Sequence, residues 1–170
     1  MINRIKSLLK ARIVVPFYTF QVRRMAQEVG KDLRVNGRSS VTKNTILGNN
    51  VNFNGMEIGG GGNVKIGNNF HSGPGCLMIT QNHDYDQGDA IPYGSKYIYK
   101  DIIIEDNVWL GDRVIILGGV TIGEGAIIQA GSVVVSDIPK YGIAGGHPAK
   151  VFKYRNKEHY EKLKSEGKFL

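Results

Sequence analysis

A repeat of six residues runs through the second half of the chain and constrains its fold more than any other feature. Between Ile104 and Pro139 the sequence divides into IEDNVW, LGDRVI, ILGGVT, IGEGAI, IQAGSV and VVSDIP. The first position of each hexad is aliphatic, and the fifth is apolar or small. A helix buries one face every three to four residues and a strand every two, so neither explains a period of six. Each hexad is therefore expected to be a short strand followed by a corner.

Three hexads would close one triangular coil, and stacked coils would bury their aliphatic side chains in one continuous core. Gly, Asn and Asp fill the expected corners, where positive backbone φ angles are needed, and the chain has 23 glycines. A looser form of the repeat precedes the strict one, so the coil is expected to begin near Arg34. Its aliphatic and aromatic positions are Val41, Leu47, Phe53, Ile66 and Met78.

Two segments interrupt the repeat. The run from Gly59 to Gly62 is expected to be a bulged corner, because no strand–loop–helix context supports a phosphate-binding loop. Residues 84–100 abandon the repeat, and an extruded, functional loop is expected there. The resulting plan is an N-terminal helical segment at 1–30, a coil domain at 31–150 and a C-terminal tail with a charged helix at 151–170.

The net charge of +7 is concentrated at the two ends of the chain. Residues 1–27 hold six basic and no acidic side chains, and residues 140–170 hold eight basic and three acidic ones. Residues 28–139 are mildly acidic, with eight basic and twelve acidic side chains. A nucleic-acid-binding protein is therefore not expected, because its main surface would be basic with interleaved aromatic residues. Basic ends fit phosphate ligands or an anionic surface.

The N-terminal segment is expected to be a helix interrupted at Pro16. Its apolar face is formed by Ile2, Ile5, Leu8 and Leu9. A cap packed on the coil is favoured over the alternative, an amphipathic anchor through residues 1–28 on an anionic membrane surface. The apolar run 13–20 is too short to span a membrane and has no cleavage signal after it, so neither export nor a membrane span is expected.

The single cysteine, Cys76, excludes an internal disulfide framework and any multi-cysteine metal site. It stands at the fifth position of the hexad SGPGCL, which points inward, so a packing role is expected and not a covalent acyl-cysteine. A lone cysteine suits a reducing compartment. The protein is therefore expected in the cytoplasm, either free or at the inner face of the membrane.

Three motifs, in this order, resemble those of the hexapeptide-repeat acyltransferases: QNHDYD at 81–86, IEDNVWLG at 104–111 and GGHPAKVFKYR at 145–155. The likeness covers roughly residues 48–155 and is strongest to galactoside, maltose, capsular-polysaccharide and antibiotic acetyltransferases. It implies an all-β fold, a left-handed parallel β-helix with an extruded loop and short terminal helices. It also implies a homotrimer that moves an acetyl group from acetyl-CoA to a hydroxyl of a sugar or glycan without a metal.

The resemblance assigns the catalytic roles to two residues. His83 would be the general base, since an imidazole titrates near neutrality and can take the proton of an attacking hydroxyl. Its tautomer would be held by a backbone carbonyl or by the carboxylate of Asp84 or Asp86. The backbone N–H of Asp112, just after the Trp-Leu-Gly step, would stabilise the negative charge on the thioester carbonyl oxygen.

The binding residues implied by the resemblance fall into two groups. The acceptor would contact Asn52, Asn54, Asp84, Tyr85 and Trp109. Acetyl-CoA would contact Trp109, Gly111, Ala130, Gly131, Lys150 and Lys153, with Arg155 as another candidate for the phosphates. The chain departs from many relatives at Val135-Ser136, where they carry a Thr-Lys pair, so part of the phosphate contact is either missing or supplied by Lys140.

Three alternatives remain open at this point. The first is an N-acetyltransferase that acts on the amine of a nucleotide-linked amino sugar with the same base and donor. The second is a non-catalytic trimeric scaffold, against which the complete set of motifs argues. The third is a zinc carbonic anhydrase, which needs three converging histidines, and of His71, His83, His147 and His159 only the first two lie in the coil region.

Overall fold

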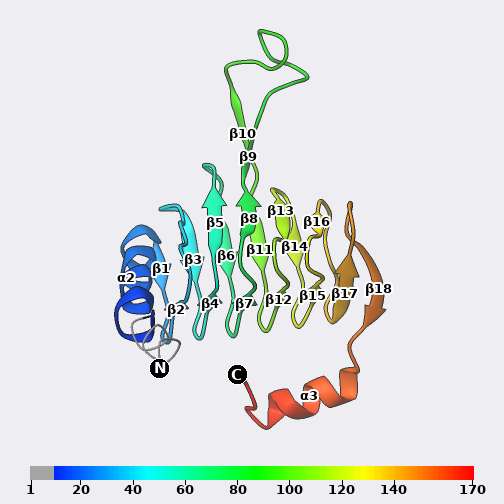
Figure 1. Ribbon diagram of the computed structural model, residues 1–170. Coiled ribbons are helices and arrows are strands. Elements are labelled where there is room, and N and C mark those ends of the chain that lie inside the picture. The colour runs from blue at the N-terminus through cyan, green and yellow to red at the C-terminus, as the bar shows by residue number, and fades with distance from the viewer. Residues whose placement is uncertain (1–9) are drawn as a thin grey trace.

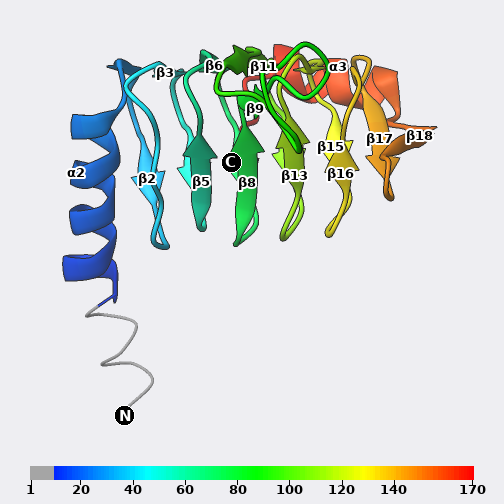
Figure 2. The same cartoon turned by 90° about the horizontal axis from the view of Figure 1, so that it is seen from above.

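The computed structural model describes residues 10–170 and confirms the expected fold, a left-handed parallel β-helix with a projecting hairpin and two short helices (Figure 1). The coils stack in a single row (Figure 2). Helix α2 (Val15–Met25) stands at the first end of the row, preceded by a π-helical turn, η1 (Lys10–Val14). Helix α3 (Lys157–Ser165) folds back from the last coil.

Three sheets form the faces of the β-helix, and the chain passes from face A to face B to face C in turn. Face A contains β1 (Glu28–Val29), β3 (Thr45–Leu47), β6 (Val64–Ile66), β11 (Ile102–Ile104) and β14 (Thr121–Ile122). Face B contains β2 (Arg34–Val35), β4 (Asn52–Phe53), β7 (His71–Ser72), β12 (Trp109–Leu110), β15 (Ile127–Ile128), β17 (Gly142–Gly145) and the antiparallel β18 (Lys150–Tyr154). Face C contains β5 (Met56–Gly59), β8 (Cys76–Ile79), β13 (Ile115–Leu117) and β16 (Val133–Val134). The corners between the faces are called edges AB, BC and CA.

The core lies inside the coils and is built from the first positions of the hexads. Residues one coil apart are aligned, as in the pairs Leu110–Ile128 and Ile116–Val134, so their side chains stack along the axis. Each such aliphatic side chain is at most 1% exposed, and burial of one contributes about 1.5–3 kcal/mol. The first positions are Ile104, Leu110, Ile116, Ile122, Ile128 and Val134.

A ladder of polar side chains fixes edge AB. The N–H of Lys31 donates to the side-chain oxygen of Asn49 at 2.8 Å, Asn49 N–H to Asn68 at 2.9 Å, and Asn68 N–H to Asp106 at 2.7 Å. Each step thus joins a corner amide to the residue one coil further on. The residues that follow these asparagines and Asp106 have positive φ angles, as the corner prediction required: Asn50, Asn69 and Asn107.

Helix α2 caps the first coil. Val22 is fully buried, and the N–H of Val35 donates to the Thr19 hydroxyl at 3.0 Å. Pro16 lies in the first turn of α2, directly after η1, so the helical conformation changes from π to α at the point where the sequence predicted an interruption. The expected apolar face of residues 2–9 lies outside the described residues. Among residues 10–170, no helix is long and apolar enough to cross a membrane.

The coil begins earlier than expected, at β1 and not near Arg34. The N–H of Gln27 donates to the Thr45 carbonyl at 2.8 Å, and that of Gly30 to the Leu47 carbonyl at 2.9 Å, which aligns β1 with β3. This outermost strand is covered on only one side by another coil. It therefore does not need the inward aliphatic pattern by which the other strands are recognised.

At edge CA the chain leaves the coil as an antiparallel hairpin, β9 (Gln81–His83) and β10 (Tyr97–Tyr99), with the extruded loop at its tip (Figure 1). The glycine run beneath it makes room for the base of this hairpin. A Cβ atom at Gly61 would lie 2.5 Å from the Tyr99 ring, and one at Gly60 would lie 2.4 Å from the Thr80 hydroxyl. The run is thus a packing requirement of the hairpin.

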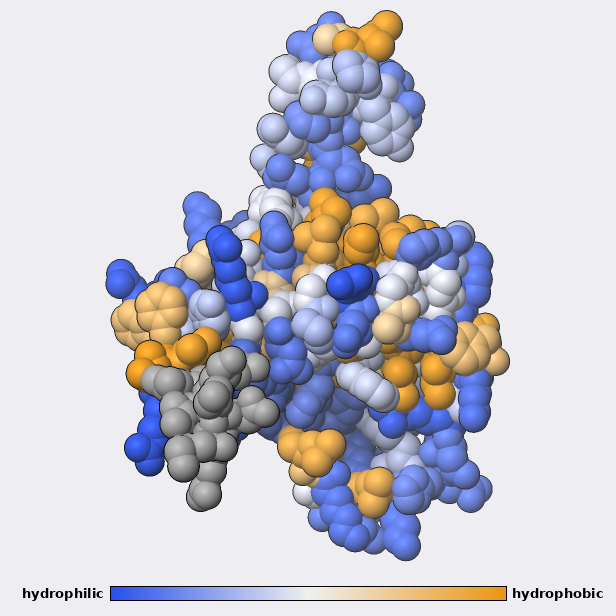
Figure 3. Space-filling view, viewed as in Figure 1, coloured by the Kyte–Doolittle hydropathy of each residue, from blue (hydrophilic) through white to orange (hydrophobic). Residues whose placement is uncertain are grey.

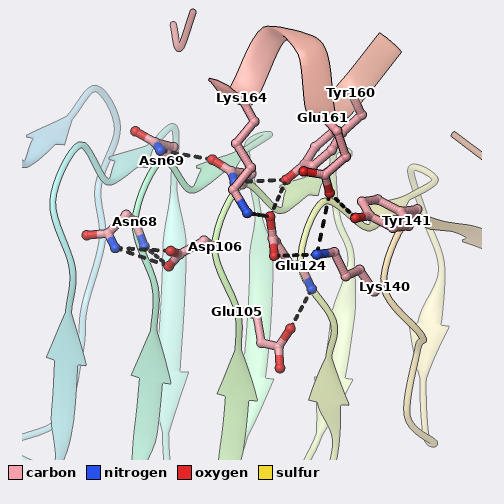
Figure 4. Close-up of polar contacts among 11 residues, drawn as sticks. Asn68, Asn69, Glu105, Asp106, Glu124, Lys140, Tyr141, Tyr160, Glu161 and Lys164 are labelled. Atoms are coloured by element: carbon pink, nitrogen blue, oxygen red, sulfur yellow. Dashed lines mark hydrogen bonds and ion pairs between the residues drawn. The ribbon is translucent and has the colours of Figure 1, made fainter. Parts of the chain in front are cut away.

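Helix α3 is attached to edge AB through Glu124 (Figure 4). The Glu124 carboxylate accepts hydrogen bonds from Lys164, from Lys140 at 2.9 Å and from the Tyr160 hydroxyl at 3.0 Å. Burial alone would raise the pKa of Glu124, but the hydrogen bonds from Lys164, Lys140 and Tyr160 outweigh it and lower the pKa to about 2. A second contact joins Tyr141 to Glu161. These bonds hold α3 over face B.

Candidate functional site

His83 ends β9 and lies opposite Tyr97 in the hairpin, outside the coil itself. Its ring is half-buried, and its Nδ1 atom lies 3.4 Å from the carbonyl oxygen of Gly94. This distance exceeds the usual 2.7–3.2 Å of an N–H···O hydrogen bond. The contact favours the neutral tautomer with its proton on Nδ1, in which Nε2 can accept a proton.

The residue that faces Nδ1 is therefore a backbone carbonyl and not a carboxylate. Asp84 Oδ1 accepts the N–H of Gln87 at 2.8 Å and so caps a turn of the loop. Among the residues that the structure describes, no carboxylate forms a hydrogen bond or an ion pair with the His83 ring. Tyr85 is 69% exposed on the loop and does not contact the ring either.

Two tyrosines that the sequence analysis did not assign lie against His83. Tyr93 stacks on the imidazole, with ring centroids 3.9 Å apart and an interplanar angle of 27°. Tyr97 lies at 4.3 Å and 40°. The motif Ile91-Pro92-Tyr93-Gly94 marked the loop as unusual, but no periodicity connects residue 93 to residue 83. Only the fold of the loop brings them together.

A second group of expected site residues lies at edge BC. Gly111 and Ala130 occupy successive coils, and a Cβ atom at Gly111 would lie 2.6 Å from the Ala130 nitrogen. The N–H of Gly131 donates to the carbonyl of Asp112 at 2.8 Å. Lys150 lies at the same edge, because it pairs with Gly145 at the end of β17. These small residues thus form a strip without large side chains along this edge, and Lys150 lies at its end.

The N–H of Asp112 forms no hydrogen bond with any part of the chain that the structure describes. At edge AB, the amides of Lys31, Asn49 and Asn68 are paired with an Asn or Asp side chain one coil further on, whereas that of Asp106 has no such partner within residues 10–170. The residue one coil further on from Asp112 is Ala130, which has no side-chain oxygen. The corner ladder is therefore missing at this point, and an exposed donor remains.

Face B carries a third group, a row of outward-facing side chains in register. Its members, from the second coil to the last strand, are Asn52, His71, Trp109, Ile127, Ile143 and Lys153. From His71 to Lys153 the row forms one wall of a cavity of about 910 Å³, and α3 and the chain end form the other. Trp109 is 52% exposed on this wall.

The cavity has a basic end. No Asp or Glu side chain is among the described residues that line it. Lys164 and Lys168 are paired with Glu124 and Glu166, whereas Lys153 and Arg155 form no ion pair within residues 10–170. Arg155 donates from Nε to the Gly125 carbonyl at 2.6 Å, and burial lowers the pKa of its guanidinium. Two cations are thus available to an anionic ligand.

Asn52 and Asn54 belong to a different ladder. Asn36 donates to the side-chain oxygens of Asn52 at 2.8 Å and of Asn54 at 3.1 Å, and Asn54 donates to the Ser72 carbonyl at 2.7 Å. These bonds occupy much of their hydrogen-bonding capacity. Both residues lie on the coils nearer to α2, away from the His83 ring.

Cys76 is buried, as its place in the hexad predicted. Its thiol lies 3.2 Å from the Gly111 carbonyl, and burial raises its pKa. Both features suit a packing role, because a reactive cysteine needs an accessible thiolate. Across residues 10–170, no three His, Cys, Asp or Glu side chains gather into a group that could hold a metal ion.

The expected site residues are therefore divided among three places in one chain. His83 is at edge CA, Asp112 and its glycine-rich surroundings are at edge BC, and Trp109 and Lys153 are on face B. Edges CA and BC are different corners of a triangular prism, so His83 and the Asp112 N–H do not meet within one chain.

The chain is similar to known proteins at the level of sequence and of structure. Residues 101–136 match the bacterial transferase hexapeptide (six repeats) family. A galactoside O-acetyltransferase from Lactococcus lactis is 38% identical over 111 residues, which are 64% of this chain and 52% of that protein. The chain thus spans about half the length of this curated relative.

Two crystal structures resemble the fold. A hexapeptide-repeat acetyltransferase from Vibrio cholerae, complexed with acetyl-CoA, has a TM-score of 0.69 at 28% identity and covers 89% of this chain and 84% of its own. A galactoside acetyltransferase in complex with coenzyme A has a TM-score of 0.70 at 30% identity, and the match covers 82% of this chain and 70% of that chain. With its hexad core, its motifs and these likenesses, the chain belongs to the hexapeptide-repeat acyltransferases.

Proposed function

We propose that the protein transfers an acetyl group from acetyl-CoA to a hydroxyl of a sugar or glycan, with His83 as general base. The observation that carries the proposal is the imidazole on its hairpin, with Nδ1 facing the Gly94 carbonyl. This contact favours the tautomer in which Nε2 can accept a proton. The galactoside acetyltransferases among its relatives support a carbohydrate acceptor.

The reaction requires one proton carrier and no covalent enzyme intermediate. Nε2 of His83 takes the proton of the acceptor hydroxyl while its oxygen attacks the thioester carbonyl. The negative charge that develops on the carbonyl oxygen is stabilised by the free N–H of Asp112. When the carbon–sulfur bond breaks, the thiolate of CoA takes the proton from His83, and the products are an acetyl ester and CoA.

Acetyl-CoA is proposed to bind along edge BC of one chain and against face B of another. The small residues Gly111, Ala130 and Gly131 support this, because they let a pantetheine arm lie close to the backbone. Lys150 would pair with the phosphates at the end of the strip. Lys153, with the apolar row on face B, would contact the same ligand from the neighbouring chain.

A trimer is proposed because the groups that the reaction needs lie on different edges of one chain. Face C offers a surface for it, with outward-facing apolar side chains beside the hairpin (Figure 3). These side chains are Leu77, Ile79, Ile115, Leu117, Val133 and Val135. A head-to-tail contact that closes after three chains would bring the hairpin of one chain to edge BC of the next. Asp84 and Tyr85 would then contact the acceptor.

Contact with the inner face of the membrane is proposed for α2. Phe17 and Phe20 of α2 and Ile13 of η1 are 55–60% exposed, and Arg23 and Arg24 lie in the last turn of α2. Wild-type protein is expected to float with vesicles that contain phosphatidylglycerol, and the double variant Phe17→Ser/Phe20→Ser is not. Phe152→Ser, at an equally exposed site on β18, serves as the control. Flotation of the double variant would refute this contact.

Release of free CoA tests the proposed activity. The purified protein, given acetyl-CoA and a panel of sugars that includes galactosides and maltose, is expected to release CoA and form an acetyl ester. His83→Ala is expected to lower kcat by roughly 10²–10⁴-fold with the fold intact. Equal turnover by this variant would refute the role of His83. Acetylated nitrogen in the product would refute a hydroxyl acceptor, and failure to bind CoA would indicate a scaffold.

A further inference from the structure

We infer that Tyr93 and Tyr97 are positioning residues, which hold the imidazole of His83 through its ring faces and stabilise it when it becomes positively charged. The acetyl-transfer role of His83 belongs to the proposed function, on which this inference rests. The stacking itself does not depend on it.

The hairpin is built to bring Tyr93 back over His83. The N–H of Gly94 donates to the carbonyl of Asp84 at 2.7 Å, which closes the loop ten residues after it starts. Gly88 and Gly94 cross at this point, and a Cβ atom on either would lie about 2.5 Å from the other. The Gly94 carbonyl faces Nδ1 as a result, and the neighbouring Tyr93 ring stacks on the imidazole.

Tyr97 reaches the same ring from the opposite strand. It is the cross-strand partner of His83, and its centroid lies 4.3 Å from that of the imidazole. Tyr99, two residues further along β10, stacks with Tyr97 at 6.4 Å and rests on Gly61. Tyr97 is thus held in place by the base of the hairpin, while Tyr93 is held by the loop.

An aromatic face attracts a cation that lies within about 6 Å of its centroid. Both tyrosine rings meet this condition for an imidazolium at position 83. A general base gains positive charge as it takes the proton, so an attraction to that charge favours the transition state over the ground state. In serine proteases a buried carboxylate supplies this attraction.

No carboxylate performs that task here among the residues described. Asp84 is bonded to the N–H of Gln87, and Asp89 is bonded to the N–H and hydroxyl of Ser95. The remaining charged side chains of the hairpin and its loop, Asp86, Lys96 and Lys100, are exposed. The groups that face the ring are two tyrosine rings and one carbonyl oxygen, and the tyrosines add to the attraction that the carbonyl oxygen exerts on a positively charged ring.

Histidine NMR titration of the whole protein tests the inference without any substrate. The four histidines are followed through the pH range 5–9, and the His83 signal is identified by its loss in His83→Ala. In Tyr93→Leu and in Tyr97→Leu the midpoint of the His83 titration is expected to fall by about half a pH unit, because the cation–π attraction is lost. Tyr93→Phe and Tyr97→Phe keep an aromatic face and are expected to keep the wild-type midpoint.

Two further variants separate ring electronics from packing. Ile98→Ala alters the same hairpin on the opposite side of β10 from Tyr97 and Tyr99, so its midpoint is expected to stay unchanged. Pentafluorophenylalanine at position 93 keeps the ring shape but reverses its quadrupole, so its midpoint is expected to fall as in Tyr93→Leu. The acid limb of the pH–rate profile is expected to move in parallel, with kcat about 10-fold lower in each Leu variant.

An unchanged His83 midpoint in the Leu variants would overturn the inference, and so would Phe variants that behave like Leu variants. Either result would leave the proposed function standing, since that function depends on the turnover of His83→Ala. Conversely, full turnover by His83→Ala with a shifted midpoint would refute the proposed function and leave the stacking role intact.

Discussion

At the scale of single residues, the N–H of Asp112 has no partner within residues 10–170, and the residue one coil further on, Ala130, offers it no side-chain oxygen. A side-chain oxygen at position 130 would extend to edge BC the ladder that Asn49, Asn68 and Asp106 form at edge AB. Alanine at this position keeps the donor free. The absence of a side-chain oxygen at position 130 is therefore as important to the proposed site as Asp112, which carries the N–H.

This reading predicts the effect of filling the gap. In Ala130→Asn the new side chain is expected to accept the N–H of Asp112, and kcat is expected to fall by roughly 10²-fold with no loss of thermal stability. Ala130→Leu has a side chain with the same branching and the same number of non-hydrogen atoms as Asn but no oxygen, so it reports the steric effect on acetyl-CoA binding. Steady-state kinetics of the two variants should differ in kcat. Equal kcat values would contradict a role for this N–H.

The sequence predicted the residues of edge BC from motifs but not the partners of His83. The corner positions of Gly111, Ala130 and Gly131 follow from hexad counting, because each is a fixed number of residues from an inward aliphatic position. Their role in binding acetyl-CoA was implied by the resemblance and stays a prediction. Tyr93 and Gly94 contact His83 through a loop closure that no repeat encodes. Only the structure therefore shows that a backbone carbonyl, and not a carboxylate, faces Nδ1 of His83.

At the scale of secondary-structure elements, the Glu124 carboxylate is one of the two carboxylates that attach α3, beside Glu161. Glu124 has a pKa of about 2 in the folded chain, below the ordinary value of 4.5. A carboxyl group with a lowered pKa stabilises the folded state fully above its unfolded pKa, and this contribution is lost as the pH falls through the folded pKa. The attachment of α3 is thus expected to weaken between about pH 4.5 and pH 2.

Glu124→Gln tests this attachment at neutral pH. Loss of its charged hydrogen bonds is expected to weaken the docking of α3 by about 1–2 kcal/mol and to uncover the cavity. Trp109, the only tryptophan of the chain, lines that cavity, so its fluorescence is expected to shift to longer wavelength. Glu105→Gln is the control, because Glu105 lies on the same edge and bonds only the Glu124 N–H. Wild-type fluorescence in Glu124→Gln would contradict the account.

The elements of the coil were predictable and those at its ends were not. Inward aliphatic residues such as Leu110 repeat locally, so their burial can be read from the sequence. The start of the coil at β1 was missed because an edge strand covered by α2 does not need the hexad pattern. The position of α3 depends on a contact between residues 124 and 164, and sequence spacing does not reveal such a pair.

At the scale of the whole molecule, the account requires that one chain completes the site of another. His83 on its hairpin and the Asp112 N–H on edge BC are separated by the width of the β-helix, while face C presents an apolar surface beside the hairpin. In solution, the mass of the protein by light scattering is therefore expected to be three times that of one chain. In a single chain, His83 has no N–H donor opposite it, and the N–H of Asp112 has no base opposite it.

Mixed trimers test this claim most directly. His83→Ala chains keep edge BC intact, and Ala130→Asn chains keep the hairpin intact, so each variant alone is expected to be nearly inactive in CoA release. When the two are co-expressed in equal amounts and mixed trimers are isolated through two different tags, each trimer contains one site that combines two intact halves, which is about a third of all sites. The account predicts about a third of wild-type turnover for these mixed trimers. A mixture as inactive as its parents would contradict a site shared between chains.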